Sequence, residues 1–542
     1  MSEAKNTKAQ IRLPILLSIG VAAGIWFGAT FAEPKNDRND LKSAIYKLQE
    51  IITYINRDYV DSVNTNELVE YGIEKMLNKL DPHSSYITAK DAKLAKSQLE
   101  GEFDGIGIEF GILRDTIYVV SPLTGGPSEK LGLLPGDQIV TVDGKTVAGI
   151  GVTNRDVFDL LRGPKGSVVD IGIKRKNNQD LLDFSITRDK IPQYSVNASY
   201  MIDEEVGYIK ITRFAANTHE EFRKALTDLK AQGMTKLMLD LQGNPGGYMG
   251  AAINIADELL SNEAVIVSQE GKLKRYNQKA RALRPGAFED GSIVVLINEG
   301  SASASEIVAG AIQDNDRGLI VGRRSFGKGL VQMPIDLSDG AELRLTIARY
   351  YTPSGRSIQK PYGEDEDDYG MDYFRRLEHG EFFTADSISF NDSLKYETVK
   401  GRTVYGGGGI MPDYFVPMDT TMSSPYVNRL FNSEAWREFI LDYLDKNKKV
   451  YANMSFDDYY HKYEVSDAML NELIKVGEKN KVKFVEKDFN KSKPYLKTLI
   501  KAHMGRNLYD ENAFYRVIND INEVYQQGLN LFDEATKLAF ID

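Results

Sequence analysis

Cysteine is absent from this 542-residue chain. Its absence excludes disulfide bonds, thiolate metal sites, a cysteine nucleophile and a lipoprotein anchor. Histidine is scarce, with five residues in the whole chain. None of them stands near a glycine-flanked serine, so a Ser-His-Asp triad is not indicated. No HExxH sequence is present, which disfavours a zinc hydrolase.

Positive charge is also in deficit. The net charge is −11 and the isoelectric point lies near 5.3. A nucleic-acid surface needs a basic patch, so no nucleic-acid partner is expected. The proportions of apolar and charged residues, 42% and 27%, are ordinary for a globular protein. The length predicts three or four domains.

One long apolar run lies near the N-terminus. Residues 13–32 contain no charged side chain and would span roughly 30 Å as a helix, enough to cross a bilayer. Lys5, Lys8 and Arg12 precede the run, which predicts a cytoplasmic N-terminus and export of the remainder. A cleaved signal peptide is the alternative, since Thr30-Phe31-Ala32 resembles a cleavage site. The run exceeds a usual signal core, so a retained single-pass anchor in the inner (plasma) membrane is favoured, with the bulk of the chain in the periplasm or outside the cytoplasm.

A serine-rich segment carries the strongest chemical signal. Residues 293–298 read as a buried strand and residues 304–313 as a helix. Ser303 therefore lies at a helix N-terminus, where free amides and the helix dipole favour a developing oxyanion. Lys328 and Gln332 follow, four residues apart, and are predicted to share one face of a strand or a helix. A lysine serves as a general base when burial keeps it neutral, and a glutamine can orient its amine.

The two motifs together, SASASEI followed by FGKGLVQ, resemble those of the C-terminal processing (tail-specific) proteases. Members of this family use a serine-lysine dyad on a crotonase-like (Clp-protease-like) α/β fold. The resemblance covers roughly residues 40–417. It implies that Ser303 is the nucleophile, that Lys328 is the base and that Gln332 orients the lysine. It implies neither a metal ion nor a nucleotide cofactor.

A glycine-rich loop is predicted to complete the catalytic core. Residues 236–241 read as a strand and residues 249–260 as a helix, with the sequence GNPGG between them. The family pattern is DLRxNPGG, and Gln242 stands where the family usually has arginine. The resemblance implies that Gly246 or Gly247 supplies one oxyanion-hole amide. Ala304 would supply the second. A helix-capping loop without a catalytic role is the alternative.

Residues 101–188 resemble a PDZ domain. Gly105-Ile106-Gly107-Ile108 is similar to the loop that binds a peptide's terminal carboxylate while the peptide adds as a strand. A second PDZ-like stretch follows at residues 134–144, where Asp143-Gly144 is a strong hairpin signal. Arg162 is a candidate sensor of bound peptide, against the commoner alternative of a solvated arginine. The expected ligand is a protein or peptide with an apolar C-terminal tail.

The remaining regions carry less specific signals. His83, in the sequence LDPHSSY, is interpreted as structural because Asp-Pro favours a turn. The acidic stretch within residues 362–400 is expected to be a solvated surface insertion. The predicted parts are a cytoplasmic N-terminus (1–12), a transmembrane anchor or signal segment (13–32), a helical N-terminal region (38–100), a PDZ domain (101–188), a serine protease core (191–417) with an acidic insertion (362–400) and a helical C-terminal region (418–542). That last region could brace the core, form a homodimer or bind an adaptor protein.

Other interpretations use the same residues. The sequence GRRSFGKG nearly matches a phosphate-binding loop but lacks the final hydroxyl residue. Ser325 and Lys328 form S-x-x-K, although the glycines beside the lysine argue against the helix which that motif needs. Ser301 and Ser305 are alternative nucleophiles. A non-catalytic PDZ-containing scaffold of the cell envelope is the alternative function, but it predicts loss of catalytic residues that are all present. The favoured function is a serine endopeptidase that recognises C-terminal tails of exported proteins.

Overall fold

The computed structural model describes residues 36–540 apart from 124, 177, 262 and 364–368. The predicted transmembrane segment, residues 13–32, lies outside this range. No helix within the described range is long and apolar enough to span a bilayer. The chain divides into two compact units, Met1–Leu77 and Asn78–Asp542.

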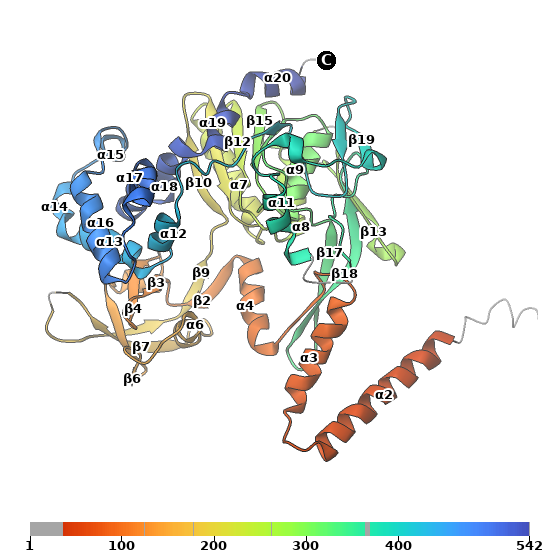
Figure 1. The fold of residues 1–542 in the computed structure, drawn as a ribbon, viewed down its shortest axis with the longest axis horizontal. Coiled ribbons are helices and arrows are strands. Elements are labelled where there is room, and N and C mark those ends of the chain that lie inside the picture. Colours follow the sequence, from red (N-terminus) through yellow and green to blue (C-terminus); the bar gives the residue numbers. More distant parts are fainter. Residues whose placement is uncertain (1–35, 124, 177, 262, 364–368, 541–542) are drawn as a thin grey trace, which may run out of the picture. The chain divides into compact units, whose positions relative to one another are not determined.

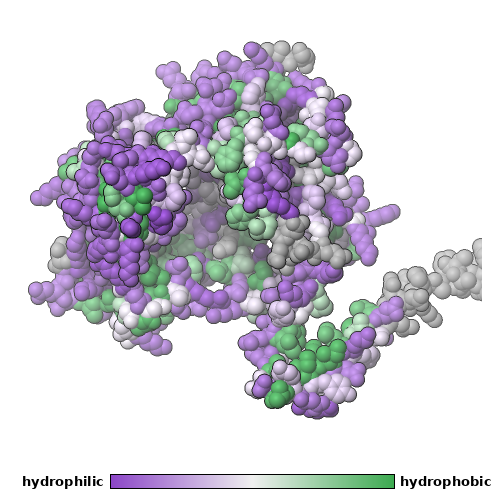
Figure 2. Space-filling model, viewed as in Figure 1, coloured by the Kyte–Doolittle hydropathy of each residue, from purple (hydrophilic) through white to green (hydrophobic). Residues whose placement is uncertain are grey.

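The first unit contains helix α2 (Asn36–Asp58) and nearly all of helix α3 (Thr65–Asn78). Leu41, Ile45 and Leu48 lie at helical spacing on α2, and each is about half exposed or more. Figure 2 shows apolar surface, in green, on this part of the chain. The apolar stripe that predicts a helix here is therefore formed, with little of its surface covered within this unit.

The core of the second unit is a six-stranded sheet in the order β10-β11-β12-β15-β16-β21. All neighbouring strands are parallel except β10 and β11. A parallel sheet needs cover on both faces, which agrees with the nearly continuous apolar sequences of its central strands. The strands are β10 (Val196–Met201), β11 (Val206–Ile211), β12 (Lys236–Asp240), β15 (Ser292–Ile297), β16 (Leu319–Gly322) and β21 (Tyr414–Phe415).

Helices cover both faces of this sheet (Figure 1). One face packs Leu237, Leu239 and Val295 against helices α7 (Thr218–Ala231), α8 (Met249–Asp257) and α9 (Ala304–Asp314). The alternate residues Met238 and Val294 pack on the other face against α19 (Glu523–Leu529) and α20 (Phe532–Phe540). The end of the C-terminal region thus braces the core, as one of the sequence interpretations holds.

A second sheet lies next to this core and holds an unexpected strand. Its order is β1-β18-β13-β14, and β17 also pairs with β18. The strand β1 falls inside residues 38–100, which the sequence predicts to be helical, so that prediction is wrong at this point. Pairing with the long β18 supplies backbone partners that local periodicity cannot reveal. The elements are β1 (Ser85–Ile87), α4 (Ala89–Glu100), β13 (Val265–Gly271), η1 (Lys274–Tyr276), β14 (Gln278–Arg281), β17 (Leu330–Asp336) and β18 (Glu342–Tyr351).

The segment that resembles a PDZ domain forms its own sheet, in the order β3-β4-β5-β7-β8 with β6 on β5. The antiparallel pair of β2 and β9 stands where the chain enters and leaves this segment. Strand β3 is an end strand of the sheet, so one of its edges has no partner strand among the described residues. The elements are β2 (Glu102–Gly105), β3 (Ile108–Ile112), β4 (Ile117–Pro122), α5 (Pro127–Lys130), β5 (Gln138–Val142), β6 (Lys145–Thr146), α6 (Asn154–Leu161), β7 (Val168–Lys174), β8 (Leu182–Thr187) and β9 (Asp189–Pro192).

The acidic insertion is less solvated than the sequence suggests. Phe382 is fully buried, and Arg376 and Glu381 are nearly so. Arg376 donates to the main-chain carbonyl of Ser325, which ties the insertion to the core. The expectation of a solvated surface segment is therefore wrong for this part, because buried ion pairs offset its charges. The elements here are α11 (Asp372–Glu378), η2 (Ala385–Ser387), η3 (Asp392–Leu394), β19 (Lys395–Glu397) and β20 (Thr403–Tyr405).

The C-terminal region is helical and has its own apolar core. Three ion pairs, Arg114–Glu438, Lys176–Asp445 and Arg506–Glu109, join it to the segment that resembles a PDZ domain. The helices are α12 (Pro425–Phe431), α13 (Glu434–Lys446), α14 (Lys448–Tyr451), α15 (Phe456–Lys462), α16 (Asp467–Lys479), α17 (Glu486–Leu508), α18 (Glu511–Ile518) and η4 (Asn519–Ile521), followed by α19 and α20.

Candidate active site

Ser303 occupies the strand-to-helix turn that the sequence predicts. Strand β15 ends at Ile297 and helix α9 begins at Ala304, directly after the serine. Ser303 is half-buried and has a φ of +55°. A positive φ is costly for a residue with a Cβ and is concentrated at functional sites. The turn therefore presents Ser303 in a strained conformation at a helix N-terminus.

The three neighbouring serines have structural roles. Ser301, Ser305 and Ser325 are fully buried, whereas Ser303 is not. Ser301 and Ser305 donate their hydroxyls to main-chain carbonyls of the residues after β12, at 2.8 and 2.9 Å. The Ser325 hydroxyl donates to the Glu306 carboxylate at 2.5 Å. Their burial and hydrogen bonds make these three serines poor alternatives as nucleophiles.

A buried carboxylate joins the two predicted catalytic segments. Glu306, in the first turn of α9, is fully buried. Its Oε2 accepts from the amide of Ser303 at 2.7 Å and from the amide of Lys328 at 2.9 Å. Its Oε1 accepts from the amide of Gly327 at 2.7 Å. Burial raises the pKa of Glu306 to about 7, against the lowering effect of these hydrogen bonds. One side chain thus holds the backbone of nucleophile and base together.

Tyr350 on β18 makes a second connection between the same residues. Its hydroxyl lies 3.1 Å from the Ser303 carbonyl and also contacts the Lys328 carbonyl. The side chain is fully buried, and burial raises its pKa well above the ordinary value. The phenol is therefore neutral and can donate to these carbonyls.

Lys328 lies in the loop before β17, which begins at Leu330. Only Gln332 belongs to β17, and a register shift falls just before it, so the regular alternation of a strand does not relate the two residues. Burial lowers the pKa of Lys328, and Arg344 lowers it further, against opposing contributions from Glu306 and Asp81. This is the direction that a lysine base requires. GRRSFGKG leads into this strand rather than a helix, which contradicts the phosphate-loop interpretation.

The glycine loop after β12 lies against the Ser303 turn. A Cβ on Gly246 would lie 2.7 Å from Ser303 Cβ, and one on Gly247 would lie 2.0 Å from the Phe214 carbonyl oxygen. Both glycines also have positive φ, +96° and +145°, so no other residue fits. The Gly246 amide donates to the Asn244 side chain at 2.9 Å. The amides of Gly247 and Ala304 have no acceptor among the residues that the structure describes.

Gln242 stands where the family usually has arginine, and the buried ion pair Lys210–Asp240 lies next to it. Asp240 accepts from the ammonium of Lys210 at 2.9 Å and from the hydroxyl of Tyr208 at 2.7 Å. Lys210 also donates to the Gln242 carbonyl at 2.6 Å. A cation therefore anchors the start of the glycine loop without any contribution from the Gln242 side chain.

The LDPHSSY segment lies beside the base. The Asp81 carboxylate accepts from the amides of His83 and Ser84 at 2.8 and 2.9 Å, which forms the predicted turn. The His83 ring lies 2.9 Å from the Tyr369 hydroxyl. Burial lowers the pKa of His83 to about 4, and Lys328 contributes in the same direction. His83 is therefore neutral near pH 7 and packed, as a structural histidine would be.

This histidine gives a stability prediction. The His83 pKa is lower in the folded protein than in the unfolded chain, where it is near 6.5. Neutral His83 therefore contributes fully to the free energy of unfolding above pH 6.5, and this contribution is lost as the pH falls towards 4. We expect His83→Gln to lose less unfolding free energy than the wild type between pH 7 and pH 4, by about 2 kcal/mol for this partly exposed ring. Urea denaturation at several pH values measures the difference. His503, whose pKa is lowered in the same way, is unchanged in both proteins. Parallel pH profiles would contradict the assignment.

The predicted peptide-binding loop, Gly105 to Ile108, joins β2 to β3. All four of these residues are buried. Ser128 donates its amide and its hydroxyl to the Ile106 carbonyl at 3.1 and 2.6 Å, which fixes the loop. Within the described part of the chain, the amides of Ile106 and Gly107 have no hydrogen-bond acceptor. The loop thus keeps donors available next to the free edge of β3.

Arg162 is not a solvated arginine. Its guanidinium lies over the ring of Phe103 at 4.2 Å and over that of Phe158 at 4.4 Å. Its buried Nε has no hydrogen-bond partner among the described residues, and burial lowers its pKa. Phe158 lies on α6 and also contacts Phe110 on β3. Arg162 is therefore stacked next to the predicted peptide site.

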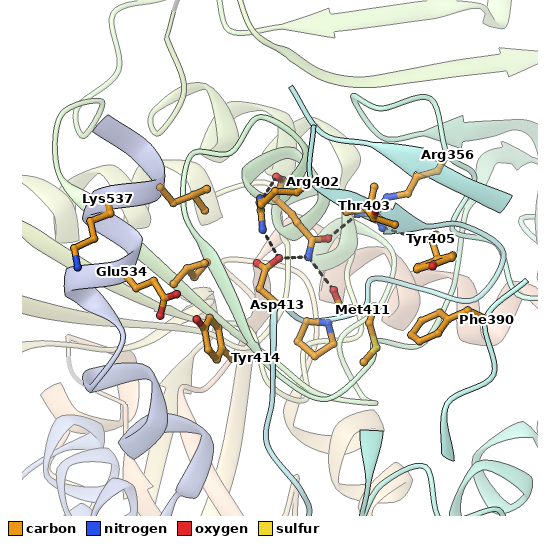
Figure 3. Close-up of a pocket in the computed structure, with 15 residues that line it drawn as sticks. Arg356, Phe390, Arg402, Thr403, Tyr405, Met411, Asp413, Tyr414, Glu534 and Lys537 are labelled. Carbon is orange, nitrogen blue, oxygen red and sulfur yellow. Dashed lines mark hydrogen bonds and ion pairs between the residues drawn. The ribbon is translucent and has the colours of Figure 1, made fainter. Parts of the chain in front are cut away.

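A pocket of about 960 Å³ contains none of the predicted site residues (Figure 3). Two of its cations are already bonded, Arg402 to Asp413 and Arg356 to Gln313. The pocket therefore offers no chemistry comparable to that around Ser303. Its lining residues are Gln313, Leu319, Arg356, Phe390, Arg402, Thr403, Val404, Tyr405, Met411, Pro412, Asp413, Tyr414, Glu534, Lys537 and Leu538.

Sequence reasoning missed Glu306, Tyr350 and Asp81. A signal for Glu306 exists, because Ser303 and Glu306 match the S-x-x-E pattern of a helix start. Tyr350 stands in a strand with no distinguishing motif. Asp81 is part of the turn that the sequence predicts. Its hydrogen bond with Thr346 on β18 joins residues that are distant in the sequence, which no local pattern indicates.

Family models match four stretches of this chain. Residues 205–367 match peptidase family S41, and residues 118–175 match a PDZ domain. Residues 28–91 match the N-terminal domain of the activating protease CtpB, and residues 426–510 match a family of unknown function. The first two matches cover the Ser303 site and most of the sheet that contains β3.

Curated relatives extend the likeness over most of their length. A carboxy-terminal-processing protease of Bartonella bacilliformis is 38% identical over 355 residues, which are 64% of this chain and 80% of the relative. The carboxy-terminal processing protease CtpB of Bacillus subtilis is 34% identical over 68% of this chain and 74% of its own length. With this identity and coverage, the chain belongs to the carboxy-terminal processing proteases of peptidase family S41 and is a serine-type peptidase.

Proposed function

We propose that this peptidase captures the C-terminal tail of a protein with its PDZ domain and cleaves the chain with Ser303 and Lys328. The observation that carries the assignment of the dyad is the Glu306 carboxylate, which bonds the amides of both residues. Burial lowers the pKa of Lys328, which is the direction that a lysine base requires. The relatives' names support a substrate defined by its carboxyl end.

The geometry supports acyl transfer through a covalent intermediate. The Ser303 hydroxyl oxygen attacks the scissile carbonyl carbon while its proton passes to the Lys328 amine. The amides of Gly247 and Ala304 stabilise the oxyanion. Breakage of the C–N bond returns the proton from Lys328 to the departing amine. Water then attacks the ester by the same route and regenerates Ser303. Gln332 orients the lysine amine throughout.

Tail capture uses the free edge of β3. A peptide can add to this edge as a further strand, with its terminal carboxylate at the amides of Ile106 to Ile108. Arg162, stacked on Phe103 and Phe158, borders the groove and would respond to its occupancy. The apolar surroundings of this loop favour a substrate with an apolar last residue.

The cell envelope is the proposed location. Residues 13–32 have the length and composition of a single membrane anchor, with basic residues on the cytoplasmic side. The catalytic unit would then act in the periplasm or outside the cytoplasm on exported proteins. Fractionation of cells that express the full chain, with and without residues 13–32, tests this location.

Amidation of a substrate's C-terminus is expected to weaken its capture about tenfold or more. The amide removes the charge that the Ile106–Ile108 loop recognises, and each charge-assisted hydrogen bond is worth roughly 1.5–3 kcal/mol. A substrate that ends in aspartate should also be cleaved poorly, because its charge would enter an apolar pocket. The measurement compares kcat/KM for free-acid, amidated and aspartate-ended versions of one peptide.

The control is a peptide that carries the aspartate substitution at an internal position far from its end. It should be cleaved at the original rate. Equal rates for all three end groups would show that this peptidase does not select its targets by their tails. That result would leave the dyad assignment intact.

A further inference from the structure

A chain of hydrogen bonds runs from Asp81 to the predicted catalytic glutamine. The Asp81 Oδ1 accepts from the Thr346 hydroxyl at 3.0 Å, and the Thr346 Oγ1 accepts from Gln332 Nε2 at 3.2 Å. Ser84 braces the same contact, since its hydroxyl donates to Asp81 at 2.7 Å and accepts from the Thr346 amide at 3.1 Å. Asp81 is nearly fully buried, at 7% exposure. The arrangement exists because β1 pairs with β18 next to the Gln332–Thr346 pair.

The Asp81 carboxylate determines which group donates in each hydrogen bond from Asp81 to Gln332. Burial would raise the pKa of Asp81, but hydrogen bonds from Ser84, from the His83 amide and from Thr346 lower it below its ordinary value. An ionised carboxylate accepts only, so the single hydroxyl proton of Thr346 points to Asp81. The Thr346 oxygen then has only lone pairs to offer Gln332. Gln332 must therefore present its NH₂ group to Thr346, with its carbonyl oxygen on the other side.

We propose that Asp81 and Thr346 are positioning residues that fix the side-chain amide of Gln332 so that its carbonyl oxygen is offered to the Lys328 amine. This inference rests on the proposed function and adds residues from the segment before the PDZ domain to the catalytic machinery. Without the relay, the amide could rotate and present its NH₂ group to the lysine. That group repels an ammonium and leaves no acceptor for a neutral amine.

The effect should fall on turnover rather than on substrate binding. Lys328 becomes an ammonium only after it takes the Ser303 proton, so an acceptor at Gln332 stabilises a state that forms during the reaction. The other charged or titratable groups that influence this lysine are Arg344 on β18, Glu306 on α9 and His83 in the turn. Glu306 is held by four donors, and none of these groups contributes a hydrogen bond to Gln332 among the described contacts.

The central test is Thr346→Val, which keeps the shape and removes the hydroxyl. We expect kcat to fall by about 10- to 100-fold with KM nearly unchanged. Thr346→Ser, which retains the hydroxyl, should restore most of the loss. Thr536→Val removes a hydroxyl of similar burial that contacts Ser292 and α20. It should lower the unfolding temperature without an effect on kcat.

A Gln332→Ala background separates positioning from general damage. If Thr346 acts through Gln332, Thr346→Val should cost little further kcat in that background, because effects within one network are not additive. If the full loss persists there, Thr346 is merely structural and the proposal is overturned. The proposed function would then still stand, provided that Ser303→Ala and Lys328→Arg are inactive.

Asp81→Asn gives a second, independent readout. Asp81 raises the pKa of Lys328, so removal of its charge should lower that pKa. The acid limb of the kcat/KM profile should then shift to lower pH, while Thr346→Val should leave the limb near its wild-type position. The positioning role is read from kcat, and a wild-type kcat in Asp81→Asn would overturn the proposed role of Asp81. Circular dichroism at each pH establishes that both variants are folded.

Discussion

Peptide cleavage is expected to fall by at least about 10³-fold when Ser303 is replaced by alanine. Alanine lacks the attacking oxygen but keeps the amide that donates to Glu306, so the turn and helix α9 should remain intact. Binding of a substrate tail should be retained, because the predicted peptide-binding loop, residues 105–108, belongs to the PDZ segment and not to the Ser303 turn. Steady-state cleavage of a free-acid peptide and a binding titration with the same peptide measure the two properties.

Three alanine variants serve as matched controls, at Ser301, Ser305 and Ser325. Each of these hydroxyls makes a buried hydrogen bond, so each loss should cost about 1 kcal/mol of stability or somewhat more. Measurable cleavage should nevertheless remain in all three. If Ser325→Ala alone were inactive, the S-x-x-K interpretation would replace the present assignment.

Lys328→Arg should be equally inactive although it conserves the charge. An arginine stays protonated at every pH that the protein tolerates, so it cannot accept the Ser303 proton. The backbone amide that bonds Glu306 is unaffected by the exchange, and the fold should persist. In the wild type, activity should fall as pH decreases, because the lowered pKa of Lys328 marks the loss of its neutral form. The measurement is kcat/KM from pH 6 to pH 10.

Lys328→Met provides the comparison, since it removes charge and base together without a bulky cation. Both variants should be inactive and should bind the substrate tail. Substantial turnover by Lys328→Arg would show that another group accepts the proton.

The sequence predicts the local geometry of this site well because that geometry depends on short-range patterns. Residues 293–298 and 304–313 were expected as strand and helix, and β15 and α9 nearly match those limits. The strand and the helix need only apolar periodicity and a helix start, which are local patterns. The family resemblance, rather than a local pattern, implied that the glycine loop lies beside the serine, and Gly246 does lie against Ser303.

What the sequence did not predict depends on contacts across long separations. Asp81 meets Thr346 across 265 positions, and β1 forms only because β18 offers it a partner. Tyr350, on β18, bonds to Ser303, which follows a strand of the other sheet. No periodicity encodes such pairings, and a three-residue strand has too little pattern of its own. The buried charges of the acidic insertion were misread for the same reason.

The four hydrogen bonds to Glu306 also determine how this peptidase could be switched off. The loop of residues 325–328 cannot shift gradually, because two of its amides and one hydroxyl bind the carboxylate that also holds Ser303. Departure of the loop would remove three of the four donors from a buried carboxyl group at once, which costs more than the loss of one bond. We therefore expect the enzyme to alternate between two discrete states, fully assembled or disengaged, with few intermediate levels of activity in any one molecule.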